Sequence, residues 1–237
     1  MTPAESDGLW AGLIGFGCLA AVAVLALLVV LVLVGRRRNG QRRESLRRWA
    51  GRNGWVYVPL PTLDWGTRLP GGNRGGVSVV VSGVVAGQRV SVAEYEHTET
   101  YTGTGSDGMG GTTSTTSSHS HPYVVVVVHL GHAYPSVEVS PRGAAAKVGR
   151  ALLGGGGAVT GDRDFDRAFQ VDGDPVAVRW VLSPALVAAH VAGSVPPWIL
   201  HQGELMTYLP GRLEQVDRIP ALAEPLTRVA AMLPRLT

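Results

Sequence analysis

An uncharged apolar run from Leu9 to Val34 constrains this chain more than any other feature. At about 1.5 Å per residue a helix of this length reaches about 39 Å, and a bilayer core is about 30 Å thick. A cleaved signal peptide begins with basic residues and has a shorter apolar core, whereas acidic residues precede this run. We therefore predict a transmembrane helix over 9–35 that follows a short extracytoplasmic N-terminus, 1–8.

The residues after the run set its orientation. Eight arginines and one glutamate lie within 36–52, and the positive-inside rule places such a basic flank in the cytoplasm. Anionic lipid headgroups attract basic residues near the surface by about 1 kcal/mol each. We predict a single-pass protein of the cell membrane, with its N-terminus outside and a basic juxtamembrane helix over 36–53. For Trp49, the lipid interface and packing against the following domain are equal alternatives. The membrane-surface candidates are Arg36, Arg37, Arg38, Arg42, Arg43, Arg47, Arg48 and Trp49.

The positive charge of the chain is concentrated beside this helix. Residues 36–52 carry +7 and the N-terminus −2, so the whole-chain charge of +3 leaves −2 for 53–237. Nucleic-acid binding needs a basic patch, and this slightly acidic remainder shows none in its sequence. The one cysteine, Cys18, lies inside the apolar run, which excludes a disulfide framework. The partners that we predict are therefore the lipid bilayer and its anionic headgroups, with no nucleic acid.

Strand patterns dominate the first part of the predicted cytoplasmic domain. Val77–Val85 is rich in valine and Arg89–Thr100 alternates, so the turn between them predicts a hairpin. Tyr123–Leu130 is apolar on both faces, as in a central strand covered on both sides. The Gly/Ser/Thr run over 101–121 has almost no apolar residue and predicts a mobile loop.

The last third mixes strands with helix start signals. Asp174-Pro175 and Ser183-Pro184 each match an N-cap followed by proline at the first helical position. Phe165–Val171 predicts a strand, and Trp198–Leu209 predicts a hairpin that turns at 202–204. Strands followed by helices indicate an α+β fold, in which helices cover a mainly antiparallel sheet. The predicted cytoplasmic domain spans 54–237, and its C-terminal segment 213–233 is mostly helical.

Several short motifs in this order resemble a family of uncharacterised, membrane-anchored actinobacterial proteins. The motifs are Glu94-Tyr95-Glu96, His121-Pro122-Tyr123, Phe165-Asp166-Arg167-Ala168-Phe169, Ser183-Pro184-Ala185-Leu186 and the turn at Gly203–Leu205. They are aromatic core positions, caps and turns. The resemblance implies the fold described above and a membrane anchor, and it implies no activity and no catalytic residue.

Histidines cluster between 97 and 132, where five of the seven lie. A zinc site needs three or four such ligands held tetrahedrally. In the hairpin arrangement, rings from the two ends of the predicted loop converge. The alternative is that they are polar residues at strand ends and in a solvated loop, and we predict no bound metal and no cofactor on that basis. The candidate ligands are His97, His119, His121 and His129.

The sequence carries no convergent catalytic set. No serine lies in a G-x-S-x-G motif, and Gly154–Gly157 lacks the Lys-Ser/Thr that completes a P-loop. We therefore predict that the protein is not an enzyme. Its cytoplasmic domain is expected to be a membrane-tethered, non-catalytic binding or interaction module with a protein partner that the sequence does not identify. The alternative is a metal-dependent enzyme or sensor that uses the histidine cluster at 97–132.

Overall fold

The computed structural model of the chain describes residues 25–27, 29–31, 33–34, 37, 40–106, 112–142 and 160–235. The chain forms two compact units, Met1–Arg48 and Trp49–Thr237. In the first unit, the described residues of the apolar run are helical and exposed, as Leu25 is at 64%. Within the described ranges, no helix is long and apolar enough to cross a membrane. Most of the predicted span over 9–35 lies outside these ranges, so the span and its orientation stay predictions.

Residues 40–52 form the helix that the sequence predicts after the anchor. Trp49 is only 4% exposed, and its ring lies 5.3 Å from that of Trp55. The Trp55 ring in turn lies on Gly83, where an added Cβ atom would approach it to 2.3 Å. Of the two alternatives for Trp49, the structure therefore shows packing within the domain, because this side chain exposes almost no surface to lipid.

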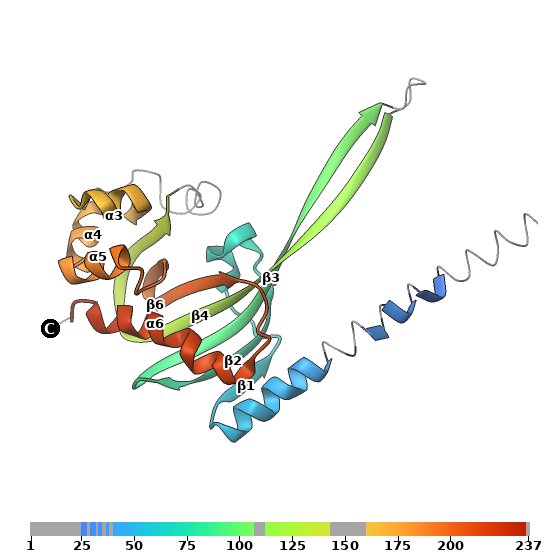
Figure 1. Cartoon of the computed structure of the whole chain (residues 1–237), viewed down its shortest axis with the longest axis horizontal. Coiled ribbons are helices and arrows are strands. Elements are labelled where there is room, and N and C mark those ends of the chain that lie inside the picture. Colours follow the sequence, from blue (N-terminus) through green and yellow to red (C-terminus); the bar gives the residue numbers. More distant parts are fainter. Residues whose placement is uncertain are drawn as a thin grey trace, which may run out of the picture. The chain divides into compact units, whose positions relative to one another are not determined.

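In the described part of the second unit, six strands form the sheet (Figure 1). They are β1 (Val56–Pro59), β2 (Val77–Val85), β3 (Gln88–Ser106), β4 (Thr112–Pro141), β5 (Phe169–Gly173) and β6 (Trp198–Pro210). The order is β1-β2-β3-β4-β5, and β6 also pairs with β4. Every pairing between these described strands is antiparallel. The predicted α+β fold with a mainly antiparallel sheet is confirmed.

Helices lie on both faces of this sheet. They are η1 (Trp65–Arg68), η2 (Pro70–Gly72), α3 (Arg163–Ala168), α4 (Pro175–Val181), α5 (Pro184–Val191), η4 (Val216–Arg218) and α6 (Ile219–Met232). The long helix α6 crosses one face and packs against β2, β3, β4 and β6 (Figure 1). On the other face, Trp65 of η1 and the adjacent Leu69 join a buried cluster with Val80, Ala93 and Val125. This second face is only partly covered, and the candidate site lies on it.

The predicted hairpin and central strand are confirmed. Val85 pairs with Gln88, and the turn residues Ala86 and Gly87 have φ values of 49° and 78°. Positive φ at both central positions is the geometry of a two-residue type I′ turn. β4 pairs with β3 along one edge and with β6 along the other, and the valines at 124–128 are all buried.

Residues 101–106 and 112–121 form strands instead of the loop that the sequence predicts over 101–121. Strands β3 and β4 continue through it as a two-stranded ribbon, from Tyr101 opposite Ser117 to Ser106 opposite Thr112 (Figure 1). Low apolar content argues against a core, but β-branched threonine favours strands. The ribbon also prolongs a ladder whose register the buried valines already fix. Residues 107–111 lie outside the described ranges.

Two other predictions in the last third are wrong. The segment Trp198–Leu209 is one strand rather than a hairpin, because β6 pairs with β4 along both halves. At the predicted turn the strand is only irregular. Gln202 has a φ of 54°, and the register between β6 and β4 shifts twice there. The predicted strand Phe165–Val171 begins instead as helix α3, whose first turn is capped by the Asp162 carboxylate. Strand β5 starts only after that helix ends.

Side-chain caps begin the next two helices where the sequence predicts them. The Asp174 carboxylate accepts hydrogen bonds from the backbone N–H groups of Val176 and Ala177, at 2.9 and 3.1 Å. The Ser183 hydroxyl accepts one from the N–H of Leu186 at 3.3 Å. Each cap satisfies donors that have no partner within the helix.

Candidate functional site

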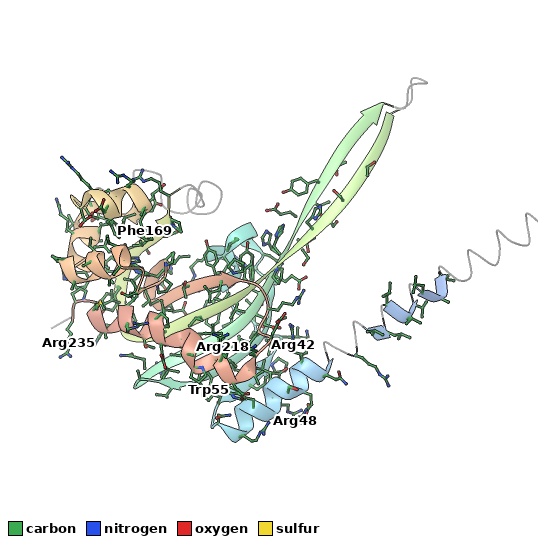
Figure 2. All side chains as sticks on the ribbon, viewed as in Figure 1. Arg42, Arg48, Trp55, Phe169, Arg218 and Arg235 are labelled. Carbon is green, nitrogen blue, oxygen red and sulfur yellow. The ribbon has the colours of Figure 1, made fainter. Side chains whose placement is uncertain are left out.

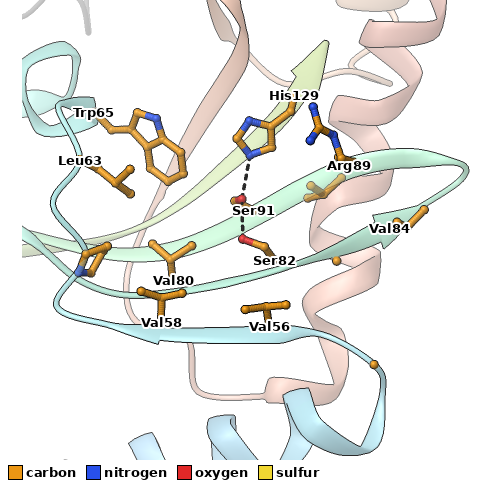
Figure 3. Close-up of a pocket in the computed structure, with 14 residues that line it drawn as sticks. Val56, Val58, Leu63, Trp65, Val80, Ser82, Val84, Arg89, Ser91 and His129 are labelled. Carbon is orange, nitrogen blue, oxygen red and sulfur yellow. Dashed lines mark hydrogen bonds between the residues drawn. The ribbon is translucent and has the colours of Figure 1, made fainter. Parts of the chain in front are cut away.

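A groove of about 530 Å³ opens beside η1 on the partly covered face of the sheet (Figure 3). Its apolar lining comes from β1, β2 and the segment that leads into η1. Val56 and Val84 are 62% and 63% exposed, so the groove leaves large apolar surface in contact with water. Contiguous exposed apolar surface in a concave site is typical of a binding site rather than of a solvated face. The apolar lining includes Val56, Val58, Leu63, Trp65, Val80 and Val84.

One end of the groove is polar. Ser82 and Ser91 face each other across β2 and β3, and their hydroxyl oxygens lie 2.8 Å apart. The Ser91 hydroxyl also lies 2.8 Å from Nε2 of His129 on β4 (Figure 3). Arg89 is the register partner of His129 and lines the same end. A hydrogen-bonded chain therefore crosses three strands and ends beside a guanidinium group.

The electrostatics of this end favour an anion. Burial lowers the pKa of His129, the Arg89 guanidinium lowers it further, and the Glu204 carboxylate opposes both. The imidazole is therefore neutral near neutral pH, and Arg89 supplies the positive charge. No ion pair joins this guanidinium to a carboxylate among the residues that the structure describes.

A partly buried ion pair fixes the wall of the groove. The Trp65 indole N–H donates to Glu204 Oε1 at 2.9 Å, and Arg68 Nη2 donates to Oε2 at 2.6 Å. Arg68 is 9% exposed and also lies 3.5 Å from the Asp64 carboxylate. Both carboxylate oxygens of one β6 residue thus hold η1 on the sheet. This arrangement sets the position of the indole ring that lines the groove.

The structure separates the histidines that are candidate metal ligands. His97 and His121 face each other across β3 and β4, and their rings stack with centroids 5.1 Å apart. His119 lies farther along the ribbon, 6.2 Å from the ring of Tyr101, while His129 belongs to the groove. In the described part of the chain, no group of three or more His, Cys, Asp or Glu is placed to hold a metal ion. The metal-dependent alternative stays a prediction without support from this geometry.

The predicted membrane-surface arginines lie only partly within the described residues. Arg42, Arg43, Arg47 and Arg48 are on the helix at 40–52, on which Figure 2 labels Arg42 and Arg48. Arg48 lies 3.7 Å from the Glu44 carboxylate. Arg37 is described and exposed, whereas positions 36 and 38 lie outside the described ranges. The role of these arginines at a lipid surface stays a prediction.

Ser91 and His129 also satisfy the distance requirement for a nucleophile and its base. A catalytic triad needs a third group that orients the histidine. Among the described residues, only Ser91 hydrogen-bonds to His129. Ser91 is 3% exposed, and its hydroxyl is already held between Ser82 and His129. The arrangement favours binding over nucleophilic catalysis.

Sequence patterns indicate little of this site beyond His129. Glu204 comes opposite His129 only through the pairing of β6 with β4, which a single sequence does not reveal. One signal was available in the strands themselves, because Ser82 and Ser91 are polar positions within valine-rich segments. Polar residues on the buried face of a strand need partners, and such residues mark either a network or a site.

No family model and no curated protein sequence matches this chain, so the resemblance to a membrane-anchored actinobacterial family stays a prediction. Among solved structures, the chain is similar to the crystal structure of the mycobacterial trehalose monomycolate transport factor A, TtfA. The TM-score is 0.44 and the sequence identity 15%, over 84% of this chain and 97% of that chain.

Proposed function

We propose that this protein is a membrane-tethered, non-catalytic binding protein whose groove takes the apolar chain of a single-chain anionic amphiphile, with a fatty acid as the simplest example. One observation carries the proposal: an apolar groove of about 530 Å³ ends at a guanidinium group and a preformed chain of hydroxyl and imidazole groups. An amphiphile likewise consists of an apolar chain that ends in a polar headgroup.

The size and lining of the groove support an apolar chain. Small-molecule sites usually measure about 300–1,000 Å³, and this groove falls within that range. Burial of one methylene group stabilises a complex by about 0.8 kcal/mol. An alkyl chain laid along Val56, Val58 and Val84 would also remove their exposed side chains from water.

The polar end supports an anionic headgroup. A carboxylate near Arg89 would accept charge-assisted hydrogen bonds, which are about twice as strong as bonds between neutral groups. When the Ser91 hydroxyl donates to Ser82, the Ser82 hydroxyl can donate a further hydrogen bond at the same end. A cationic headgroup would meet the Arg89 charge at this position and is disfavoured.

The N-terminal sequence supports a location where such amphiphiles are abundant. The described residues of the apolar run expose Leu25, Leu27 and Leu31 by 59% or more. Exposed leucines at this density call for an apolar environment, and a bilayer supplies one. The arginines that follow the run favour the cytoplasmic side.

Affinity is expected to rise steeply with chain length. In displacement of a dansylated fatty acid from the full-length chain in nanodiscs, hexanoate, octanoate and decanoate should bind progressively tighter. The expected gain is about fourfold per methylene, because each buried methylene contributes about 0.8 kcal/mol. Affinities refer to free aqueous concentrations, and empty nanodiscs supply the background.

A matched pair of tryptophan variants locates this binding. Val58→Trp fills the groove at a position that is 39% exposed, so the fold should tolerate it. Val176→Trp places the same bulk on α4, where the valine is 66% exposed and does not line the groove. Binding lost in the first variant and kept in the second supports the proposal. Equal binding in both, or affinity independent of chain length, would contradict it.

A further inference from the structure

A second, smaller cavity of about 190 Å³ lies between η1 and the far half of the sheet. Most of the residues that line it have polar side chains, and they include Asp64, Thr67, Arg68, Ser136 and Glu138. This volume is below the roughly 300 Å³ at which sites for drug-sized ligands begin. Any occupant is therefore a small molecule.

Glu138 is the unusual residue of this cavity. It is 6% exposed, and no hydrogen bond or ion pair joins its carboxyl group to another described residue. Asp172, its register partner on β5, is also 6% exposed, and among the described residues it accepts hydrogen bonds only from Gln170, at 3.1 and 3.3 Å. Burial, and then the Asp172 charge, raise the pKa of Glu138 to about 7. Two buried carboxyl groups thus lie together, and no cationic group in the described part of the chain pairs with either.

The groups around Glu138 leave the cavity with excess negative charge. From the η1 side come Asp64 and Arg68, whose guanidinium donates to Glu204 through Nη2 at 2.6 Å, while its buried Nη1 has no hydrogen-bond partner among the described residues. From β6 comes His201, whose Nδ1 lies 2.7 Å from the Ser136 hydroxyl. The Tyr208 hydroxyl is neutral, because burial and then the Glu138 charge raise its pKa. None of these groups neutralises the Glu138 carboxylate.

An apolar cavity adjoins the same residue. This space measures about 150 Å³, and Glu138 and Ile199 line both cavities. Its other walls include Trp198, Met206 and Tyr208. A molecule held at Glu138 by a charged group therefore has apolar surface within reach for a short carbon chain.

We propose that Glu138 binds the ammonium group of a short primary alkylamine, whose carbon chain lies against Ile199 in the adjoining cavity. An ammonium group carries three hydrogen-bond donors and a full positive charge. Among the described residues, the Glu138 carboxylate has neither a donor nor a cation as its partner. Charge pairing is strong here because both partners are shielded from water. This site is separate from the groove of Figure 3 and takes the opposite charge, so it stands independently of the proposed amphiphile.

Calorimetric titration of the full-length chain in nanodiscs tests this site with butylammonium as the probe. 1-Butanol, the neutral molecule of the same size, should bind at least tenfold more weakly. At about pH 6 each bound amine should also release close to one proton, because Glu138 must ionise to pair with it. Titrations in two buffers of different ionisation enthalpy measure that release.

The variants Glu138→Gln and Glu214→Gln separate this site from nonspecific binding. Glu138→Gln removes a buried charge without changing volume, so it should fold and lose at least tenfold in butylammonium affinity. Glu214 is exposed and lines neither cavity, so its variant should bind like the wild type. The proposal is overturned by equal binding of the amine and the alcohol, by unchanged affinity of Glu138→Gln, or by no binding of butylammonium.

Discussion

Replacing Arg68 with leucine is expected to lower the free energy of unfolding by about 3 kcal/mol, because it leaves the Glu204 carboxylate without its buried partner. The Arg68 guanidinium is 9% exposed and lies 2.6 Å from Glu204 Oε2. Glu204 is 27% exposed, which places the cost at the low end of the range for buried pairs. Urea unfolding of the full-length chain, followed by tryptophan fluorescence, measures the loss.

A double variant and an exposed control complete this test. The Arg68→Leu/Glu204→Leu variant should recover part of the stability, since it removes both charges together. Arg179→Leu on α4 removes an exposed guanidinium and should change stability by about 0.5 kcal/mol or less. If Arg68→Leu were as stable as Arg179→Leu, the ion pair would not be what holds η1 on the sheet.

Two buried groups are expected to give opposite pH dependences that offset each other in the wild type. His190 is 1% exposed, accepts a hydrogen bond from the Trp198 indole at 2.9 Å, and has its pKa lowered by burial to about 4. As the pH falls, His190 gains its proton near pH 6.5 in the unfolded chain but only near pH 4 in the folded chain. The His190 contribution therefore makes stability rise with pH between about 4 and 6.5. Glu138, with its pKa raised to about 7, keeps its proton up to a higher pH in the folded state than in the unfolded chain. Its contribution makes stability fall as pH rises from 4.5 to about 7.

The variant Glu138→Gln should therefore expose the His190 effect. Relative to the wild type, its free energy of unfolding should rise by about 1.4 kcal/mol per pH unit between about pH 4.5 and 7, or by about 3 kcal/mol across this range. His190→Gln should shift the profile in the opposite sense below about 6.5. Urea unfolding at a series of pH values measures both differences, and other titrating groups cancel in each comparison. Parallel profiles for wild type and Glu138→Gln would show that Glu138 ionises normally.

Local patterns predicted the parts of the fold that depend on neighbouring residues. Alternation identified the β2–β3 hairpin, and the caps at Asp174 and Ser183 identified the starts of α4 and α5. The ribbon over 101–106 and 112–121 was missed because it prolongs a ladder whose register is fixed farther along β3 and β4, and the single strand β6 was missed because it pairs with the distant strand β4. Pairing with a neighbouring strand, rather than the composition of the segment alone, decides both.

The same limit explains what the sequence showed of the site. His129 stood out as a histidine, but its actual partner, Ser91, lies 38 residues away on a neighbouring strand. Arg68 and Glu204 are 136 residues apart and meet only when η1 folds over the sheet. Glu138 carries no sequence signal, because its unusual state comes from burial beside Asp172. Charge, burial and long-range pairing together create these sites, and each needs the folded chain.

The position at which a bound fatty acid contacts the chain bears most directly on the proposed function. A fatty acid with a diazirine at the end of its carbon chain can be added to vesicles that contain the full-length protein, then photolysed and mapped by mass spectrometry. We expect crosslinked peptides from the groove segments 56–65 and 80–91, competed by unlabelled decanoate, lost in Val58→Trp and kept in Val176→Trp. Crosslinks confined to the apolar run at 9–34, with none in the groove segments, would contradict the proposed function.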